Sequence, residues 1–333
     1  MNQDELQNTV LCGDELEMLK RLPDEYVQMC VTSPPYYGLR DYGAEGQIGC
    51  EQTPLEYIDR LTEIFREVRR VLKSNGTLWL NIADSYAGSG KGVWSKSLAE
   101  RPKSKQTYHS LNTDENAALP KKWDGIKEKD MIGIPWQLAF ALRADGWYLR
   151  SDIIWQKPNC LPEAVKDRPT KSYEHIFLLS KSPHYYYDTA AISEPVAPVT
   201  VERNKRAVSD RTKYAKGVGG AKPQALFLPR SHSDMPTKRN KRDVWSVSTN
   251  SHRGYGHFAM YPERLIEPCI LAGSPEQGLV LDPFFGRGTT GAVCKRLSRR
   301  YLGIELNPEY CETAKTRIQQ TKEELYLGSK NQP

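Results

Sequence analysis

A short segment near the C-terminus constrains the fold most, because it runs from a strand through a Gly-rich turn directly into a helix. Residues 279–291 read LVLDPFFGRGTTG, and Glu305 ends the next expected strand nineteen residues after Gly286. Glycines at such a turn let the backbone approach a ligand, and the helix N-terminus behind it favours an anionic group. An acid about twenty residues further on binds ribose hydroxyls in known nucleotide folds. The spacing predicts a nucleoside-binding turn in an α/β fold, although a purely structural tight turn has the same pattern.

Strand and helix patterns alternate along the chain, which is typical of βαβ units and predicts a mainly parallel sheet. The apolar strand GTLWLNIA at residues 76–83, for example, suits a strand covered by helices on both faces. Strands are expected at residues 9–12, 26–32, 76–83, 147–155, 175–180, 279–282 and 301–305. Helices are expected at residues 14–21, 55–72, 134–144, 262–272, 289–297 and from 308 onward. A seven-stranded, Rossmann-like sheet follows.

The 333 residues, 38% of them hydrophobic, are enough for one large α/β domain with a smaller insertion. Residues 84–130 and 190–255 show little periodicity. We expect residues 1–189 and 256–333 to form one domain, with a loop insertion at 84–130 and a separately folded insertion at 190–255.

Positive charge is concentrated in the second irregular region. Residues 200–243 hold twelve Lys and Arg against four acids, so the net charge of this segment is +8. The rest of the chain has a net charge of −2, which gives +6 for the whole. A basic block of this kind is typical of an element that contacts nucleic-acid phosphates, and a solvated loop is the alternative. We expect Arg239, Lys241 and Arg242 to contact DNA.

Other compositional signals exclude several classes of protein. The seven cysteines are widely spaced, without a Cys-x-x-Cys pair or a zinc-ligand cluster, so reduced thiols and no metal site are expected. No stretch reaches the roughly 18 apolar residues of a membrane span, and the acidic N-terminus is unlike a signal peptide. A cytoplasmic protein without a membrane partner is expected.

A second motif, VTSPPYY at residues 31–37, follows the apolar strand at 26–32. Its residues Ser33 to Tyr36 should therefore lie at the carboxyl end of the strand, where α/β sheets bind ligands. Two prolines hold the backbone rigid and remove N–H donors. The Ser33 hydroxyl and a carbonyl such as that of Pro34, beside an exposed Tyr36 ring, suit a planar base with an amino group. A stiff turn with an ordinary tyrosine is the structural alternative.

Together the two motifs resemble the amino-methyltransferases of DNA, whose signatures are (Asp/Asn/Ser)-Pro-Pro-(Tyr/Phe) and (Asp-Pro-)Phe-x-Gly-x-Gly. The Ser-Pro-Pro-Tyr motif precedes the Gly-rich loop by some 250 residues. This order resembles the permuted β group, in which a target-recognition region lies between the motifs. The resemblance extends to Gly13-Asp14 and to segments 155–159, 171–177 and 257–265.

The resemblance implies S-adenosylmethionine as cofactor and double-stranded DNA as substrate, with the target base flipped out of the duplex. It implies a catalytic motif formed by Ser33, Pro34, Pro35 and Tyr36. It further implies that Glu305 binds the ribose hydroxyls and that Asp14 lies on the adenine side. The loop around the methionine part would consist of Asp282, Phe284, Gly286, Gly288 and Thr289.

The identity of the target base is the most specific inference that the resemblance allows. Within the family, Ser at the first motif position is typical of cytosine-N4 enzymes and Asp of adenine-N6 enzymes, so Ser33 favours N4 of cytosine, with adenine N6 as the alternative. Cytosine-C5 chemistry needs a Pro-Cys nucleophile motif, and Pro268-Cys269 lacks the rest of it. A nicotinamide-dependent oxidoreductase would need a second nucleotide-binding half, but only 28 residues follow Glu305. An RNA methyltransferase and a non-catalytic DNA-binding module remain alternatives, and a partner restriction nuclease is possible for a bacterial or phage enzyme of this kind.

Overall fold

The computed structural model describes residues 6–38, 46–87, 125–160, 162–202, 237–249 and 260–322. The chain divides into two compact units. The larger unit comprises Met1–Asp188 and Asp243–Pro333, and the smaller unit comprises Thr189–Arg242. Most of the loop expected at 84–130, and much of the basic segment, lies outside the described residues.

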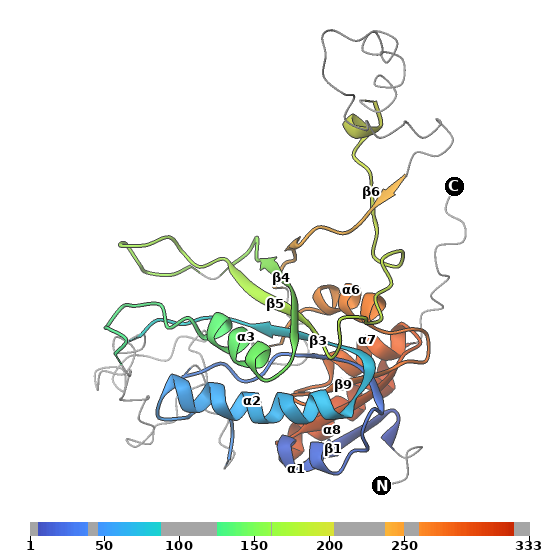
Figure 1. The fold of residues 1–333 in the computed structure, drawn as a ribbon, viewed down its shortest axis with the longest axis horizontal. Helices are drawn as coiled ribbons and strands as arrows, with labels where there is room; N and C mark the ends of the chain where they lie inside the picture. Colours follow the sequence, from blue (N-terminus) through green and yellow to red (C-terminus); the bar gives the residue numbers. More distant parts are fainter. Residues whose placement is uncertain are drawn as a thin grey trace, which may run out of the picture. The chain divides into compact units, whose positions relative to one another are not determined.

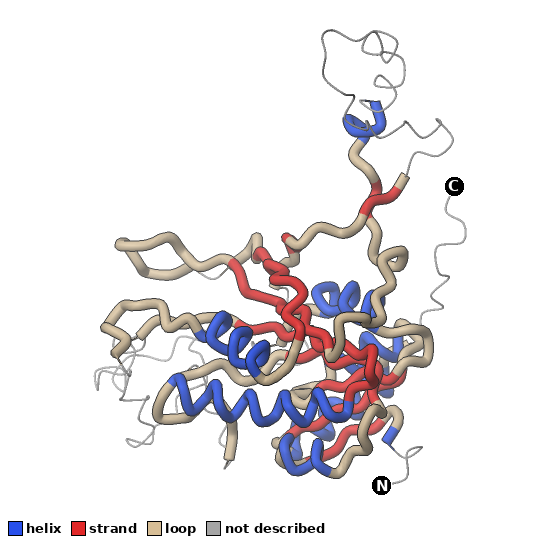
Figure 2. Tube along the Cα trace, viewed as in Figure 1, coloured by secondary structure: helices blue, strands red, loops and turns tan. Residues whose placement is uncertain are grey.

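An eight-stranded mixed sheet forms the centre of the larger unit (Figures 1 and 2). Its order is β1-β10-β9-β2-β3-β5-β4-β8. Five of its seven pairings are parallel, and β5 is antiparallel to both of its neighbours. The strands are β1 (Thr9–Cys12), β2 (Val27–Thr32), β3 (Leu72–Ile82), β4 (Tyr148–Gln156), β5 (Tyr173–Ser180), β8 (Val244–Ser246), β9 (Leu279–Asp282) and β10 (Arg300–Glu305).

Two groups of helices cover the sheet. The first group is α1 (Glu15–Lys20), α2 (Pro54–Val71) and α3 (Ile134–Ala144), and the second is α6 (Glu263–Gly273), α7 (Thr289–Arg296) and α8 (Pro308–Gln320). Helices of the first group pack side by side, as do those of the second (Figure 1). Both faces of the central strands are therefore covered, which explains why all six residues of β2 are buried.

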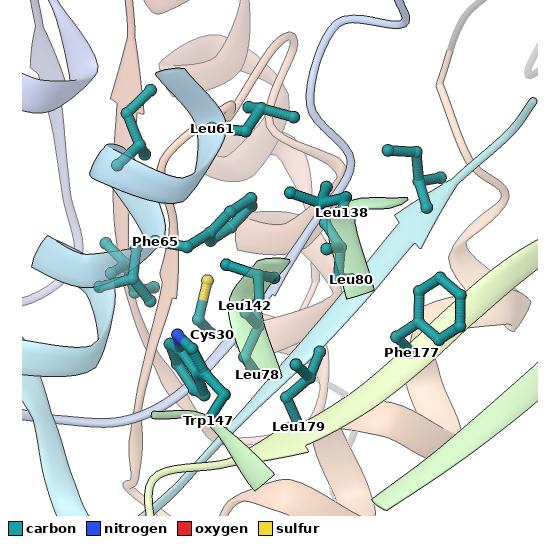
Figure 3. Packing of buried hydrophobic residues seen from close by; sticks show 14 of the residues in the cluster. Cys30, Leu61, Phe65, Leu78, Leu80, Leu138, Leu142, Trp147, Phe177 and Leu179 are labelled. Carbon is teal, nitrogen blue, oxygen red and sulfur yellow. The ribbon is translucent and has the colours of Figure 1, made fainter. Parts of the chain in front are cut away.

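The main hydrophobic core lies between the first helix group and the sheet (Figure 3). Leu61 and Phe65 of α2, Leu138 of α3, Leu80 of β3 and Phe177 of β5 belong to this core, and Figure 3 shows Leu138 beside Leu80. On the opposite face, Gly273 of α6 lies so close to the sheet that a Cβ there would be 2.9 Å from Met29 Sδ. Packing from both sides makes the central strands a rigid platform for whatever lies at their ends.

The expected α/β class, with a mainly parallel sheet and permuted motif order, is confirmed. The expected number of seven strands is wrong, since β8 adds an eighth. This strand has only three residues and pairs in parallel with β4 at the edge of the sheet. It lies within a basic, irregular region and has one buried residue, Trp245, so its sequence shows no strand pattern.

In the smaller unit, the two-residue strands β6 (Glu194–Pro195) and β7 (Lys238–Arg239) pair antiparallel. Across the part of the chain that the structure describes, no helix is both long and apolar enough to cross a bilayer. Nor do three or more His, Cys, Asp or Glu side chains of these residues gather as a metal site.

Candidate active site

The two sequence motifs lie side by side at the carboxyl edge of the parallel strands. β2 pairs with β9 through Met29 opposite Val280 and Cys30 opposite Leu281. Because the pairing is parallel, the Ser-Pro-Pro-Tyr motif after β2 and the Gly-rich loop after β9 start from the same edge of the sheet. The fold thus brings together two motifs that are far apart in sequence.

The Gly-rich loop is tied to the end of β10. The Gly286 amide donates to Glu305 Oε2 at 2.7 Å, and the Asn307 amide donates to Glu305 Oε1 at 2.8 Å. Both Gly286 and Gly288 have positive φ, +53° and +78°. Burial raises the pKa of Glu305 above its ordinary value. The structure therefore brings together the three residues whose spacing predicted a nucleoside site.

Asp14 lies beside this loop at the end of β1. The Gly13 amide donates to the Glu305 carbonyl at 2.9 Å, and Asp14 Oδ1 accepts from the Glu17 amide at 3.0 Å. Asp14 is thus the N-cap of α1, and one of its oxygens already has a donor. The next residue, Glu15, is buried, and burial together with the Asp14 charge raises its pKa from 4.5 to about 7.

Asp282 lies beneath the loop, with 1% of its surface exposed. Its Oδ1 accepts from Thr32 Oγ1 at 2.6 Å and from the Phe284 amide at 3.1 Å. Its Oδ2 accepts from Tyr261 Oη at 2.9 Å and from the Thr290 hydroxyl. Desolvation raises the pKa of this carboxyl group. These four donors connect Asp282 to β2, to Tyr261, to the Gly-rich loop and to α7, so its carboxylate holds the loop in position.

The remaining loop residues are also near the site. Phe284 is partly buried and packs against the main core. Thr289 begins α7, and its hydroxyl accepts from Arg317 Nη1 at 2.9 Å. Arg317 in turn pairs with Glu263 Oε1 at 2.8 Å, so α8 and α6 brace the loop.

These donors and acceptors fit S-adenosylmethionine. The Glu305 carboxylate provides paired acceptors suited to a ribose diol, and the start of α7 favours a carboxylate. A Cβ on Gly286 would meet no heavy atom within 4 Å, so the loop leaves open space there.

The Ser-Pro-Pro-Tyr motif is held from several sides. Ser33 Oγ donates to Tyr36 Oη at 3.3 Å, and Tyr57 Oη of α2 donates to the Pro35 carbonyl at 2.8 Å. Pro34 is buried and Ser33 is half-buried. The Tyr57 bond ties the Pro35 carbonyl to α2 and so holds the motif against this helix.

Tyr36 differs from the expected exposed ring. It is half-buried, and its hydroxyl donates to Glu174 Oε2 at 2.7 Å. Burial, and then the charge of Glu174, raises the pKa of the Tyr36 phenol well above its ordinary value. The phenol therefore remains protonated at neutral pH.

The partners of Tyr36 were missed by the motif analysis. Asn81 Nδ2 donates to Glu174 Oε2 at 3.0 Å, and Lys157 Nζ forms an ion pair with Glu174 Oε1. Glu174 and Lys157 lie within segments 171–177 and 155–159, which share the family resemblance, so a signal for them existed. Asn81 lies inside an apolar strand and had no such signal.

The three cations expected at DNA gather around one carboxylate in the smaller unit. Arg239 and Lys241 each lie 3.4 Å from an oxygen of Glu194, and Arg242 lies 3.9 Å away. The structure therefore places the three cations together, around Glu194.

Comparisons with known proteins give one consistent result. A family model described as DNA methylase matches residues 27–316. The type II methyltransferase M.SmaI of Serratia marcescens is 45% identical over 93% of this chain and 90% of its own length. M.Cfr9I of Citrobacter freundii is also 45% identical, over 93% of this chain and 87% of its own length.

Solved structures share the fold. The PvuII DNA methyltransferase, which is cytosine-N4-specific, has a TM-score of 0.59 at 18% identity, covering 94% of this chain and 86% of that one. A Thermus thermophilus protein described as a DNA modification methylase was solved with S-adenosyl-L-methionine. Its TM-score is 0.55 at 21% identity, with 94% of each chain covered. The family model and the close relatives show the family, and the Glu305-centred loop fits the cofactor. The chain therefore belongs to the DNA methylase family and is an S-adenosylmethionine-dependent DNA methyltransferase.

Proposed function

We propose that this methyltransferase modifies the exocyclic N4 of a cytosine that is flipped out of double-stranded DNA at a specific sequence. The observation that carries the proposal is the position of Ser33, directly after β2 and beside Tyr36. Serine at this motif position is typical of the cytosine-N4 enzymes in the family. The PvuII enzyme of similar fold is described as cytosine-N4-specific, but at 18% identity it supports the fold and not the base.

The chemistry required of Ser33 follows from the target. An exocyclic amino group is a poor nucleophile because its lone pair is delocalised into the ring. Accepting its two N–H bonds at Ser33 Oγ and at the Pro34 carbonyl favours a pyramidal nitrogen with a localised lone pair. The nitrogen then bonds to the methyl carbon as the carbon–sulfur bond breaks, and the product loses a proton to solvent.

Positioning is the largest contribution in this scheme. Flipping the base costs a few kcal/mol of stacking and pairing. Stacking on the Tyr36 ring recovers roughly 1 to 3 kcal/mol. The ring is tethered by its hydroxyl to Glu174, so little rotational freedom is lost when the base arrives.

S-adenosylmethionine supplies the electrophilic methyl group when it is bound. In the proposed arrangement Glu305 holds the ribose and Asp14 contacts the adenine side. Gly286, Gly288, Phe284 and Thr289 surround the methionine part. Asp282 acts indirectly, since its four donors hold the loop and the end of β2 in register.

The smaller unit is the proposed target-recognition region, with Arg239, Lys241 and Arg242 on the phosphates. The relatives named type II methyltransferases suggest that the enzyme acts in a bacterial cytoplasm alongside a restriction nuclease of the same specificity.

One experiment tests the proposed base. DNA methylated by the purified enzyme is digested to nucleosides, and N4-methylcytosine is separated from N6-methyladenine by retention time and mass. N4-methylcytosine alone is the expected product. N6-methyladenine would replace the proposed base with the alternative that the family permits.

A further inference from the structure

Glu174 lies at the point where β5 reaches the active edge of the sheet. β5 runs antiparallel to β3 and β4, so its first residues lie near the carboxyl ends of those strands. Glu174 is only 7% exposed. Its Oε2 accepts from Tyr36 Oη at 2.7 Å and from Asn81 Nδ2 at 3.0 Å, while its Oε1 pairs with Lys157. A carboxylate buried this deeply needs such partners to offset its lost hydration.

The charge of Glu174 sets the direction of the hydrogen bonds around it. An ionised carboxylate only accepts hydrogen bonds. The Tyr36 hydroxyl oxygen lies 2.7 Å from Glu174 Oε2 and 3.3 Å from Asn81 Oδ1, so its one proton points toward the closer, charged acceptor. The raised pKa of the Tyr36 phenol keeps that proton in place. The Tyr36 oxygen is then available as an acceptor, and Ser33 Oγ donates to it at 3.3 Å.

The same logic extends to Ser33. A serine hydroxyl has one proton and two lone pairs. With its proton directed to Tyr36, both lone pairs of Ser33 Oγ are left for other donors. An amino group of a base, which brings N–H donors, is the kind of ligand that such an oxygen favours.

We propose that Glu174 is a positioning residue for methyl transfer. It fixes the direction of the two hydrogen bonds that run from Ser33 to Tyr36 and from Tyr36 to Glu174, and so keeps Ser33 Oγ an acceptor for the amino group of the base. The inference rests on the proposed function of Ser33. Lys157 contributes by neutralising Glu174, and its ammonium group also lies 4.5 Å from the centre of the Trp155 ring.

Glu174→Gln tests the direction of these two hydrogen bonds. Glutamine keeps the shape, but its amide N–H can donate to Tyr36, which allows the tyrosine proton to turn toward Ser33. We expect kcat to fall about 10- to 100-fold, the usual range for losing a hydrogen bond to a charged group. KM for DNA and Kd for S-adenosylmethionine should change less than about 3-fold, since neither ligand contacts Glu174 in this scheme.

Tyr36→Phe provides the matched background, because it removes the hydroxyl through which Glu174 acts. Tyr36→Phe alone should lower kcat to a similar extent. Adding Glu174→Gln to it should cost less than about 3-fold more, because coupled residues show non-additive effects. A full additional 10- to 100-fold loss in the Tyr36→Phe background would overturn the proposal, as would a change confined to KM.

Glu174→Gln leaves Lys157 without its counter-charge, so the double variant Glu174→Gln/Lys157→Met controls for misfolding. It should bind S-adenosylmethionine normally and show the same kcat loss. Wild-type kcat in this double variant would contradict the proposal.

The activity of Ser33→Ala distinguishes a failure of the proposed role of Ser33 from a failure of the positioning role of Glu174. If Ser33→Ala retains full activity, the proposed role of Ser33 fails and the inference fails with it. If Ser33→Ala is inactive while Glu174→Gln is fully active, only the inference fails. A product of N6-methyladenine would change the base without affecting the role of Glu174.

Discussion

The Thr32 hydroxyl donates to the Asp282 carboxylate at 2.6 Å, across 250 residues of sequence. Thr32 ends β2, immediately before Ser33, and Asp282 ends β9, immediately before the Gly-rich loop. Both side chains are fully or almost fully buried. This bond therefore couples the position of the proposed methyl acceptor site to that of the cofactor loop.

We expect Asp282→Asn to destabilise the protein and Thr32→Val to do so less. Asparagine would place an amide NH2 group against hydroxyl donors, at a cost on the order of 3 kcal/mol for the buried groups left unpaired. Thr32→Val keeps the shape and removes one donor, at about 1 to 2 kcal/mol. Urea denaturation measures both free energies of unfolding. Equal values for the two variants would argue against the central role of Asp282.

Gly288→Ala should abolish cofactor binding, because the loop cannot keep its shape. Gly288 has a φ of +78°, and a Cβ there would lie 2.9 Å from Ala314 Cβ. Strain and overpacking together cost about 2 to 4 kcal/mol. Gly125→Ala is the matched control, since Gly125 has a φ of +84° but no heavy atom within 4 Å of the added Cβ. Calorimetric titration with S-adenosylmethionine should show lost binding for Gly288→Ala and normal binding for Gly125→Ala.

Glu15 should make the protein less stable as the pH rises from about 5 to about 8. Burial raises its pKa from 4.5 to about 7, so the folded protein holds this proton more tightly than the unfolded chain does. The stabilisation is complete below pH 4.5 and is lost as the pH rises through about 7. Glu15→Gln should therefore raise the melting temperature by a few degrees at pH 8 and change it little at pH 4.5. Equal melting curves for variant and wild type at pH 8 would refute this reasoning.

Arg239, Lys241 and Arg242 should contribute to the salt dependence of DNA binding. Each phosphate contact contributes about 0.9 to the slope of log K against log salt concentration, so replacing all three with Gln should reduce the slope by about 2 to 3. Glu194→Gln should have the opposite effect on affinity, because it removes the carboxylate that these cations share. Fluorescence anisotropy at several salt concentrations measures both effects, and an unchanged slope in the triple variant would remove these residues from the interface.

Much of the fold could be predicted from local pattern. The strand at Leu279–Asp282 was predicted with its observed bounds, and α3 at Ile134–Ala144 likewise, because apolar periodicity and flanking Gly residues mark both. The three-residue strand β8 could not be predicted, because a single buried residue, Trp245, makes no periodic pattern. Its pairing with β4 depends on a neighbour about ninety residues away in sequence.

The sequence by itself determined the two motifs, their permuted order, the acid at Glu305 and the basic segment at residues 200–243, since each is a matter of residue type and spacing. Only the tertiary structure decided which side chains bond to Tyr36 and to its partner Glu174. Asn81 lies on β3, Glu174 lies on β5 and Lys157 directly follows β4, and no local pattern relates the three. They meet because β5 runs antiparallel, which brings a buried carboxylate to the carboxyl edge of the parallel strands, where it must find hydrogen-bond donors.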